Sequence, residues 1–469
     1  MGTDPRPPLN GRKLDSSDVL FTWQRWSQAS SLRGDLVNSL NPDGPVLSVT
    51  APDKDTVVLN LAFPSALLMD YLTDGFYIWV MPKESDGGFN PASEAHGAGP
   101  YYMQDFLEGV HYKMVRNPNY YEQPLPYIDE QTWYIIPEAA AQIAQFEAKN
   151  LDLQHGLYTV GGGLKQEDVV DTMKRHPELL LFQVPIMDVA ATLKLGYHAP
   201  SPFEDVRVRQ ALSMLHDRDA LAEFFTSKSK LEASGLPVKA IWASHISAMF
   251  PESGDPSDAS SFGENAKYFA YNPAEARKLL EAAGRVGLEI VYHVNGADTT
   301  YVQNGELLAG HVNDTKLVNA RVQVEDLNAY ITPKISRGRG DFEGIGYSGV
   351  AFKYTAESFI YANFHPSAGT TNLKDNALFP GLVDMATKVA RELDDAKRKD
   401  IVKKFVQDAA REMPTVPVGS SSERYALTWP WLAQAGVLRP WPGDTMGARN
   451  VLYSRYWIDQ ELAKRYGKS

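Results

Sequence analysis

Helical patterns that run directly into strand patterns constrain this chain more than any other feature of its sequence. The clearest case begins at Asn272–Glu275, where an asparagine N-cap, a proline at the first helical position and a glutamate at the third predict a helix start. Apolar residues then recur at helical spacing until Gly284, which suits a helix end, and LEIVYHV follows with the pattern of a strand. Repetition of such units along the chain predicts an α/β fold with mixed sheets.

The N-terminal half gives further elements of both kinds. Asp15 and Asp18 form a capping-box-like start for a helix over the apolar-aromatic run at 19–26. The stretch 46–61 predicts two strands around a Pro-Asp-Lys-Asp turn, and YIWVMPKES predicts a strand that Pro82 ends. Residues 97–138 predict a β-meander with strands YYMQDF, HYKMVRN and QTWYIIP, followed by a helix and the short strand LDLQHG.

The stretch SPFEDVRVRQALSMLHDRDAL holds two closely spaced arginines and predicts a pair of helices. Its apolar residues lie on one helical face, which we expect to be buried: Val208, Ala211, Leu212 and Leu215. Asp205 and Arg209 are spaced as an i,i+4 ion pair worth only about 0.3–0.5 kcal/mol, and Asp217 suits the cap of the second helix. Arg207 and Arg209 are therefore interpreted as helix surface and docking groups, and not as catalytic residues.

Residues 429–443, rich in proline and glycine, are predicted to be a loop.

Composition narrows the class of protein. At roughly 100–200 residues per domain, 469 residues suggest two or three domains. The net charge of −12 argues against nucleic acid as a partner, because phosphate binding needs a basic surface. The absence of cysteine excludes disulfides, thiol nucleophiles and zinc–thiolate sites. Neither a signal peptide nor a run of about 18 apolar residues is visible.

Motifs typical of enzymes are weak. The sequence contains no GxSxG, HExxH or Walker A pattern, and no two histidines are spaced as a helical metal pair. Gly344–Gly349 formally matches GxGxxG, but no clear helix with an acidic residue about 20 positions on follows it. We therefore expect no catalytic residue, no metal site and no cofactor, and keep an unrecognised hydrolase as the alternative.

Several spaced segments together resemble one family. HGAGPYYMQDF…HYKMVRNPNYYEQPLPYIDE, SPFEDVRVRQALSMLHDRDAL, YNPAEARKLLEAAG and LDDAKRKDIVKKFVQDAAREMPTVPV are similar, in order and in spacing, to segments of extracytoplasmic solute-binding proteins of ABC importers. The type is solute-binding family 5, the oligopeptide/dipeptide-binding proteins. The resemblance extends from about residue 10 to about residue 418.

This resemblance implies a two-lobed, periplasmic-binding-protein-like type II clamp with a hinge. Lobe I would hold residues 1–190, lobe II 191–420, and residues 421–469 would return to lobe I. Asn10–Val19 is similar to the family's "DGTPVTAEDV", which a substantial region precedes in the family and only nine residues precede here. The resemblance therefore implies that lobe I is incomplete at its N-terminus and has exposed edge strands.

The function implied by the resemblance is capture of a solute between the lobes and delivery to a membrane permease, without covalent chemistry. Such a protein would be periplasmic or otherwise extracytoplasmic, and we expect a monomer. A peptide is the first expectation for the solute. However, no aspartate follows Tyr347 where the family's peptide binders hold the acid that pairs with the ligand's α-amino group, so sugar oligomers, opines and metal chelates stay open. A receptor without a role in transport also stays open.

The resemblance also points to candidate ligand-binding residues. Tyr347 and Ser348 match the lobe II pocket segment, and Trp242 lies in a stretch similar to a loop that faces the cleft. Tyr77 and Trp79 precede the MPKE segment, which the resemblance places on the lobe I side. Packing in a hydrophobic core is the alternative for each of these aromatic residues.

Overall fold

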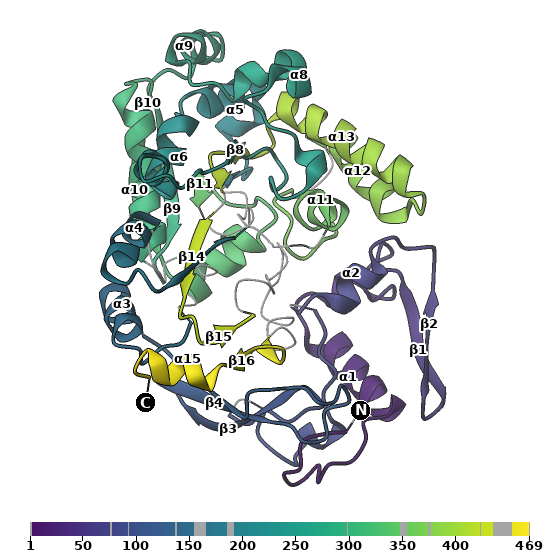
Figure 1. Cartoon of the computed structure of the whole chain (residues 1–469). Helices are drawn as coiled ribbons and strands as arrows, with labels where there is room; N and C mark the ends of the chain where they lie inside the picture. Colours follow the sequence, from purple (N-terminus) through teal and green to yellow (C-terminus); the bar gives the residue numbers. More distant parts are fainter. Residues whose placement is uncertain are drawn as a thin grey trace. The chain divides into compact units, whose positions relative to one another are not determined.

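The chain divides into two compact units. The computed structural model describes residues 2–75, 77–91, 93–136, 138–153, 166–184, 192–297, 299–347, 353, 355–373, 377–422, 424–434 and 453–468 (Figure 1). The first unit holds Met1–Phe63, Tyr71–Val184 and Tyr425–Ser469, and the second holds Pro64–Asp70 and Pro185–Arg424. No helix within the described ranges is long and apolar enough to cross a membrane.

One short segment joins the second unit unexpectedly. Residues 64–70 lie within the range assigned from sequence to lobe I, but the Ala66 amide donates to the Ala390 carbonyl at 2.9 Å. The Asp70 carboxylate, in addition, accepts a hydrogen bond from the Thr355 hydroxyl. The lobe boundaries drawn from the sequence, after residues 190 and 420, stay a prediction.

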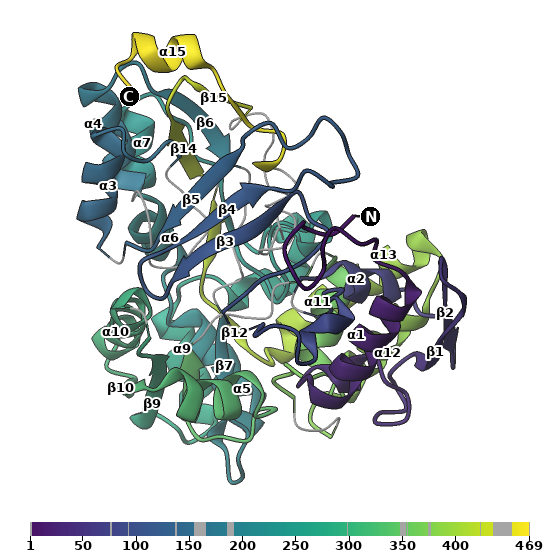
Figure 2. The same ribbon diagram turned by 90° about the horizontal axis from the view of Figure 1, so that it is seen from below.

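The first unit combines small sheets with helices along their edges (Figure 2). Its sheets are β1–β2, β3–β4–β5, β14–β6 and β15–β16. Its strands are β1 (Val46–Asp53), β2 (Thr56–Leu61), β3 (Tyr101–Leu107), β4 (His111–Arg116), β5 (Glu130–Tyr134), β6 (Leu180–Val184), β14 (Arg424–Thr428), β15 (Leu432–Ala433) and β16 (Trp457–Ile458). Its helical segments are α1 (Ser16–Ala29), η1 (Arg33–Asp35), the second half of α2 (Leu68–Thr73), η2 (Lys83–Ser85), α3 (Ala139–Glu147), α4 (Gln166–Arg175) and α15 (Gln460–Arg465).

Local sequence signals predict much of this unit correctly. Asp15 and Asp18 form the capping box of α1. The hairpin β1–β2 and the meander β3–β4–β5 are antiparallel, as the alternating patterns indicate.

The strand predicted at Tyr77–Ser85 is wrong. The segment is irregular and ends in the 3₁₀ turn η2, with Pro82 at its N-cap. Its amides are bound by side chains of α1: the Met81 amide donates to Thr22 Oγ1 at 2.8 Å and the Lys83 amide donates to Asp18 Oδ1 at 3.0 Å. Because helix side chains satisfy this backbone, it needs no neighbouring strand.

Two tryptophans form the centre of the core beside β14. Trp429 and Trp431 are fully buried, and their rings stack at 4.8 Å between centroids. Trp429 Nε1 donates to the Phe146 carbonyl at 3.1 Å, and Trp431 Nε1 donates to Asp152 Oδ1 at 2.6 Å. The prediction of a loop at 429–443 is therefore wrong at the start of that range. Trp429 and Trp431 are core residues, and Leu432–Ala433 forms a strand. Residues 435–443 lie outside the described ranges.

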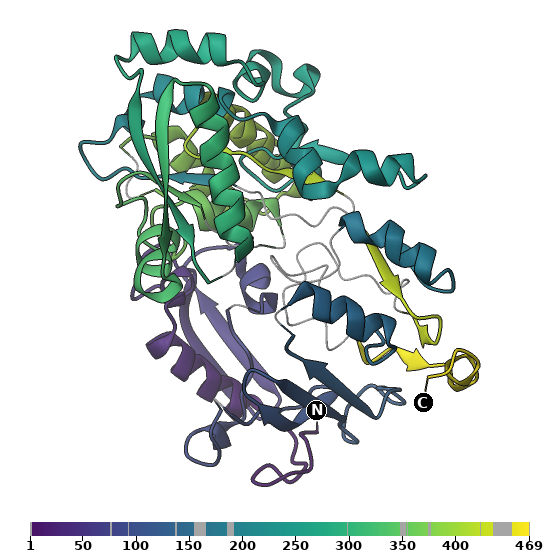
Figure 3. The ribbon, with the colours of Figure 1, turned by 90° about the vertical axis from the view of Figure 1, so that its left-hand side faces the viewer.

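The second unit is built on one mixed sheet of order β10–β9–β11–β7–β12 (Figure 3). Its strands are β7 (Thr192–Leu195), β9 (Leu288–Asn295), β10 (Val318–Glu325), β11 (Ile345–Tyr347) and β12 (Val416–Pro417), with the separate pair β8 (Ala240–Trp242) and β13 (Ser420–Ser422). Strand β9 is parallel to β10 and β11, whereas β7 is antiparallel to β11 and β12. Helix α10 connects β9 to β10 and packs on both, as a parallel crossover requires.

The second unit also holds helices, of which α10 contacts β9 and β10 and α5 contacts β12. They are α5 (Val206–Met214), α6 (Arg218–Thr226), α7 (Lys228–Ala233), α8 (Ala259–Phe262), α9 (Pro273–Ala282), α10 (Thr299–Asp314), α11 (Ala356–Phe364), α12 (Pro380–Arg391) and α13 (Asp395–Glu412). Short 3₁₀ segments are η4 (Pro202–Glu204), η5 (Pro251–Ser253) and η6 (Gly263–Tyr268), and η7 (Leu327–Ser336) is a π-helix. The Asn272 cap of α9 and both ends of α13 agree with the sequence prediction.

The two arginines of α5 have different partners from the predicted pair. Arg207, not Arg209, binds Asp205, at 2.6 Å. Arg209 is 3% exposed and donates to the Phe203 and Glu412 carbonyls, both at 2.8 Å. The predicted Asp205–Arg209 ion pair is therefore wrong: Asp205 caps the helix and binds the nearer arginine, which leaves Arg209 free to dock distant backbone.

Arg218 is the most deeply buried cation of the second unit, at 1% exposed. Its guanidinium donates to Ser213 Oγ at 2.8 Å and to the Ser213 carbonyl at 3.0 Å. It also donates to the carbonyls of Phe269 and Pro417, and it lies over the Phe269 ring at 5.2 Å. Burial lowers the pKa of Arg218 to about 9, which still leaves it charged at neutral pH.

Replacement of Arg218 by lysine tests this arrangement. A single ammonium group cannot reach carbonyls on several sides, so Arg218→Lys is expected to lower the free energy of unfolding by about 3 kcal/mol. Arg207→Lys, at the exposed pair with Asp205, is the matched control and should leave the free energy of unfolding nearly unchanged. Urea unfolding followed by circular dichroism measures both, and equal effects of the two changes would contradict the role of Arg218.

Asp70 predicts a dependence of stability on pH. The pKa of Asp70 is raised above its usual value, chiefly because the carboxyl is buried. Hydrogen bonds from Thr355 and Ser358 lower this pKa. The charge of Glu357 raises it, and the charge of Arg398 lowers it. Because the folded state holds the proton more tightly than the unfolded state, this carboxyl stabilises the fold at low pH, and that stability is lost as pH rises through its folded pKa.

Asparagine cannot ionise, so Asp70→Asn should gain stability relative to the natural protein as pH rises from about 4 to about 7. Asp395→Asn is the control of opposite sign, because hydrogen bonding to Lys399 lowers the pKa of Asp395. The measurement is the urea midpoint of each variant at several pH values. A difference for Asp70→Asn that stays constant across that range would refute the assignment.

Candidate functional site

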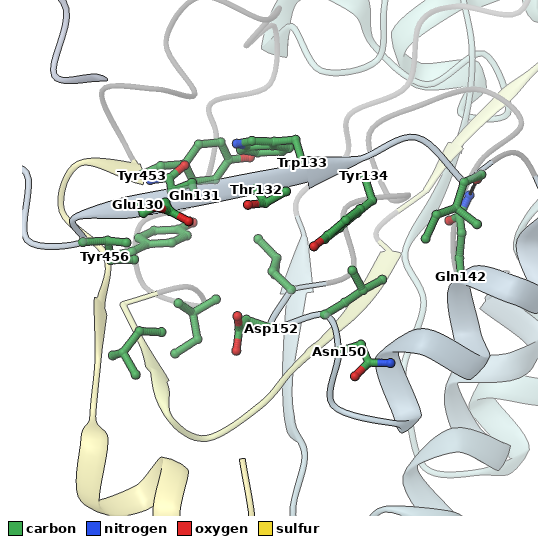
Figure 4. A pocket seen from close by; sticks show the side chains of 16 residues that line it. Glu130, Gln131, Thr132, Trp133, Tyr134, Gln142, Asn150, Asp152, Tyr453 and Tyr456 are labelled. Carbon is green, nitrogen blue, oxygen red and sulfur yellow. Dashed lines mark hydrogen bonds between the residues drawn. The ribbon is translucent and has the colours of Figure 1, made fainter. Parts of the chain in front are cut away.

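A pocket of about 370 Å³ lies entirely within the first unit (Figure 4). It is bounded by strand β5, the start of α3, residues 150–153 after α3, and four residues near the C-terminus, 432, 453, 456 and 458. Its lining residues are Ile128, Glu130, Gln131, Thr132, Trp133, Tyr134, Ile136, Gln142, Asn150, Leu151, Asp152, Leu153, Leu432, Tyr453, Tyr456 and Ile458. The volume lies within the range of small-ligand sites.

Strand β5 forms one long wall of the pocket. Five consecutive residues of β5, 130–134, line it. Since neighbouring side chains of a strand point to opposite faces of its sheet, lining by consecutive residues means that the pocket lies beside the edge of β5 and not over one face. Figure 4 shows Asn150 and Asp152 across the pocket from β5.

Aromatic rings form the end of the pocket near Trp133. The Trp133 ring packs against Tyr453 at 5.0 Å and stacks on Tyr112 at 5.8 Å, and Tyr453 packs against Tyr456 at 5.3 Å. Tyr134 is more open, at 55% exposed. Together with the isoleucines and leucines of the lining, these rings offer apolar surface with few polar tips.

The carboxylates of the pocket are already paired. Glu130 Oε2 lies 2.8 Å from Lys113 Nζ. Asp152 accepts a hydrogen bond from Trp431 and forms an ion pair with Lys468. The Gln142 side chain donates to the Ile136 carbonyl at 2.6 Å. The pocket therefore presents little uncompensated charge.

Neither of the predicted site residues of the first unit lines this pocket. Tyr77 is 4% exposed, its hydroxyl donates to Asp35 Oδ2 at 2.7 Å, and its ring packs against Tyr71 at 4.8 Å. Burial, together with the charge of Asp35, raises the pKa of Tyr77. Trp79 is 55% exposed, and its Nε1 donates to the Gly75 carbonyl at 2.6 Å. A contact of either residue with a ligand stays a prediction.

The predicted residues of the second unit lie in different sheets. Tyr347 ends β11 and is 5% exposed; its hydroxyl accepts from Asn304 Nδ2 at 3.3 Å, and its ring meets the Tyr301 ring at 5.8 Å. Trp242 ends β8, is partly buried, and donates from Nε1 to Asp219 Oδ1 at 2.9 Å. Ser348 lies outside the described residues.

The sequence interpretation missed a row of polar residues on the other face of the mixed sheet. Lys194 of β7 pairs with Gly346 of β11, which pairs in turn with His293 of β9. Lys194 is 3% exposed, and burial lowers its pKa to about 8. His293 lies 2.8 Å from Glu325 and stacks on Tyr330. In the strand TLKL, neighbouring side chains point to opposite faces of the sheet, so Lys194 lies on the face opposite to that of its two leucines. This alternation is the sequence signal that could have predicted the polar residue.

A cluster of side chains that could hold a metal ion is not found among the described residues. Within those ranges, no group of three or more histidine, aspartate or glutamate side chains is arranged so that it could hold a metal ion.

Comparison with known proteins identifies the family. The model of "Bacterial extracellular solute-binding proteins, family 5 Middle" matches residues 9–371. Di/tripeptide-binding protein 1 of Pseudomonas aeruginosa is 22% identical over 440 residues, which cover 88% of this chain and 74% of that protein. Glutathione-binding protein GsiB of Salmonella paratyphi A is 22% identical over 426 residues, which cover 83% of this chain and 73% of that protein.

Solved structures show the same fold. The periplasmic binding protein AgaA of A. tumefaciens, in complex with agropinic acid, aligns with a TM-score of 0.73 at 19% identity, over 96% of this chain and 84% of that one. The ABC transporter-associated periplasmic binding protein DppA of Helicobacter pylori, in complex with the peptide STSA, also reaches 0.73, at 14% identity, over 98% and 84%. The α/β fold predicted from the sequence is thereby confirmed as that of periplasmic binding proteins, and the chain belongs to the bacterial extracellular solute-binding proteins, family 5.

Proposed function

We propose that this chain is the solute-binding component of an ABC importer and that its solute is a peptide. The observation that carries the proposal is the family match over residues 9–371. The protein would hold the solute outside the cytoplasm and pass it, chemically unchanged, to a membrane permease. No catalytic step is part of this proposal.

The names of relatives support a peptide most directly. Di/tripeptide- and glutathione-binding proteins align over more than four fifths of this chain. A relative of the same fold was solved with agropinic acid, and another with Fe(III)-EDTA, so the fold itself does not select peptides. The choice of a peptide therefore rests on the sequence relatives. The absence of an aspartate after Tyr347 speaks against it, because the family's peptide binders hold there the acid that pairs with the ligand's α-amino group.

Among the candidate contacts, Trp242 and Tyr347 are the residues we propose for ligand binding in the second unit. Trp242 keeps part of its ring exposed while Asp219 fixes its orientation. Tyr347 is largely buried, which leaves its hydroxyl as the group best suited to touch a solute. Trp79 is exposed and stays a candidate, whereas the burial of Tyr77 makes it the weakest of the set.

A direct binding experiment tests the proposed solute. Titration of the purified chain with a mixture of tripeptides, followed by tryptophan fluorescence and native mass spectrometry, should give a 1:1 adduct with a Kd of about 1 μM or tighter. An opine and a metal–EDTA chelate are the comparison ligands. Binding of either comparison ligand without binding of tripeptides would refute the peptide assignment, and turnover of any of them would refute the transport function.

Tyr347→Phe tests the proposed contact without opening a cavity. If the hydroxyl touches the solute, the affinity should fall about tenfold, equivalent to about 1.4 kcal/mol, while the stability changes by about 1 kcal/mol or less. Tyr292→Phe is the matched control on the neighbouring strand β9, because the buried Tyr292 hydroxyl has no hydrogen-bond partner among the described residues. Unchanged affinity in Tyr347→Phe would make Tyr347 a core residue.

A further inference from the structure

One lysine of the second unit is buried without a counter-charge. Lys194 lies in β7 and is 3% exposed. Among the described residues, its ammonium group forms no hydrogen bond and no ion pair, and burial, not a neighbouring charge, lowers its pKa. With a pKa of about 8, most of these ammonium groups keep their charge at neutral pH. A charge in the protein interior needs a counter-charge or several hydrogen-bond acceptors, and the fold supplies neither to Lys194.

An apolar side chain separates Lys194 from the acidic residue on the same face of the sheet. Lys194 pairs with Gly346 of β11, and Gly346 pairs with His293 of β9. His293 in turn lies 2.8 Å from Glu325. Ile335 of η7 packs on Gly346 so closely that a Cβ atom at this glycine would lie 2.3 Å from Ile335 Cγ2. The isoleucine therefore fills the position between the lysine and the histidine–glutamate pair.

Hydroxyl side chains flank Lys194 along β7 and toward β12. Thr192 lies two residues earlier in β7, hence on the same face, and is 5% exposed. Val416 of β12 pairs with Leu193, so the antiparallel register, continued by one residue, places Thr415 opposite Lys194. Thr415 is 4% exposed, and its Oγ1 has no hydrogen-bond partner among the described residues. Hydroxyl groups cannot neutralise an ammonium, but together with it they form a set of donors that suits a carboxylate.

Lys194 also lies close to the edge of the sheet at which ligands commonly bind. In open α/β sheets, ligands bind outside the carboxyl ends of the parallel strands. Strands β9 and β11 are parallel, and Tyr347, the last residue of β11, pairs with Leu193. Lys194 is the next residue of β7, on the opposite face from Tyr347. A solute at this edge can therefore meet the tyrosine from one face of the sheet and the lysine from the other.

We propose that Lys194 is a specificity-determining residue that binds a carboxylate of the solute. This assignment rests on the proposed function, and for a peptide the carboxylate is the one at the C-terminus. The arriving carboxylate supplies the counter-charge that the fold withholds, and in a place with little water such a pair is strong. The unpaired lysine consequently lowers the stability of the protein without solute and raises the affinity for an acid, as charged groups of binding sites commonly do.

The first test compares an acid with its amide. Calorimetric titration of the full chain at pH 7 should show trialanine binding about tenfold more tightly than trialanine amide, which lacks the negative charge. In Lys194→Met and in Lys194→Gln, the affinity for trialanine should fall to that for the amide. Lys278→Met is the matched control, because the Lys278 side chain is 72% exposed and pairs with Glu275 on the surface of α9. This variant should keep the preference for the acid.

The second test uses the protein without solute. Replacement of an unpaired buried charge by an apolar side chain of similar length removes an unfavourable term, so Lys194→Met should raise the melting temperature by about 3 °C. Lys278→Met should leave the melting temperature nearly unchanged, since exposed ion pairs contribute little. A lysine with a purely structural role would give the opposite sign, because its removal would lower the melting temperature.

Three results would overturn the assignment. They are equal affinity of the natural chain for trialanine and its amide, a preference for the acid that persists in Lys194→Met, and a lower melting temperature or loss of folding in Lys194→Met. Failure of the natural chain to bind any tripeptide would refute the peptide proposal instead. In that event the comparison of succinate with succinamide, in the natural chain and in Lys194→Met, judges the role of Lys194 separately.

Discussion

The second unit depends on the burial of one positive charge. Arg218 lies at the start of α6, and its guanidinium donates to carbonyls that belong to three separate stretches, ending α5, following η6 and ending β12. The Pro417 carbonyl is 199 residues away in sequence. The two terminal amino groups of Arg218 are bonded in this way, whereas its buried Nε has no hydrogen-bond partner among the described residues. Because a buried charge needs such bonds, these backbone segments are needed together. The arginine thus joins the helical layer to the edge of the mixed sheet.

Arg209 follows the same principle on the neighbouring helix. Its side chain reaches the carbonyls of Phe203 and Glu412, and it lies over the Phe379 ring at 4.9 Å. Gln210 adds a hydrogen bond to the Arg411 carbonyl at 2.8 Å. Carbonyls near the end of a helix lack partners within the helix, and α13 ends at Glu412. Side chains of the VRVRQAL stretch in α5 therefore bind the carbonyls at the C-terminal end of α13.

Local elements were predictable because the residues that determine them are adjacent in sequence. The capping box of α1, the N-cap of α9 and the alternation of the β-meander need no information from elsewhere in the chain. Tyr77–Ser85 failed for the opposite reason. Its apolar alternation is that of a strand, but side chains of Thr22 and Asp18, about 60 residues earlier, bind its amides. Local propensity does not record such long-range partners.

The candidate pocket was beyond sequence reasoning for a related reason. Its β5 wall was predicted as a strand, yet the opposite wall and the aromatic end combine residues 150–153 with Tyr453 and Tyr456, some 300 positions later. No pattern in the sequence records that meeting. The aromatic residues were predicted to bind ligand because of their positions in motifs that resemble the family. Their exposure in the structure differs: Tyr77 packs within a core, whereas Trp79 is exposed to solvent.

The two units also differ in how their strands are assembled into sheets. In the second unit one sheet of five strands is continuous, and α10 and other helices pack on it. In the first unit the described strands form separate sheets of two or three strands. Every break between such sheets leaves backbone groups that must find water, a side chain or another strand. The Gln142 side chain satisfies one such acceptor, the Ile136 carbonyl, at 2.6 Å. Ile136 lies just beyond β5, so this hydrogen bond satisfies a backbone group at the end of that strand without a neighbouring strand.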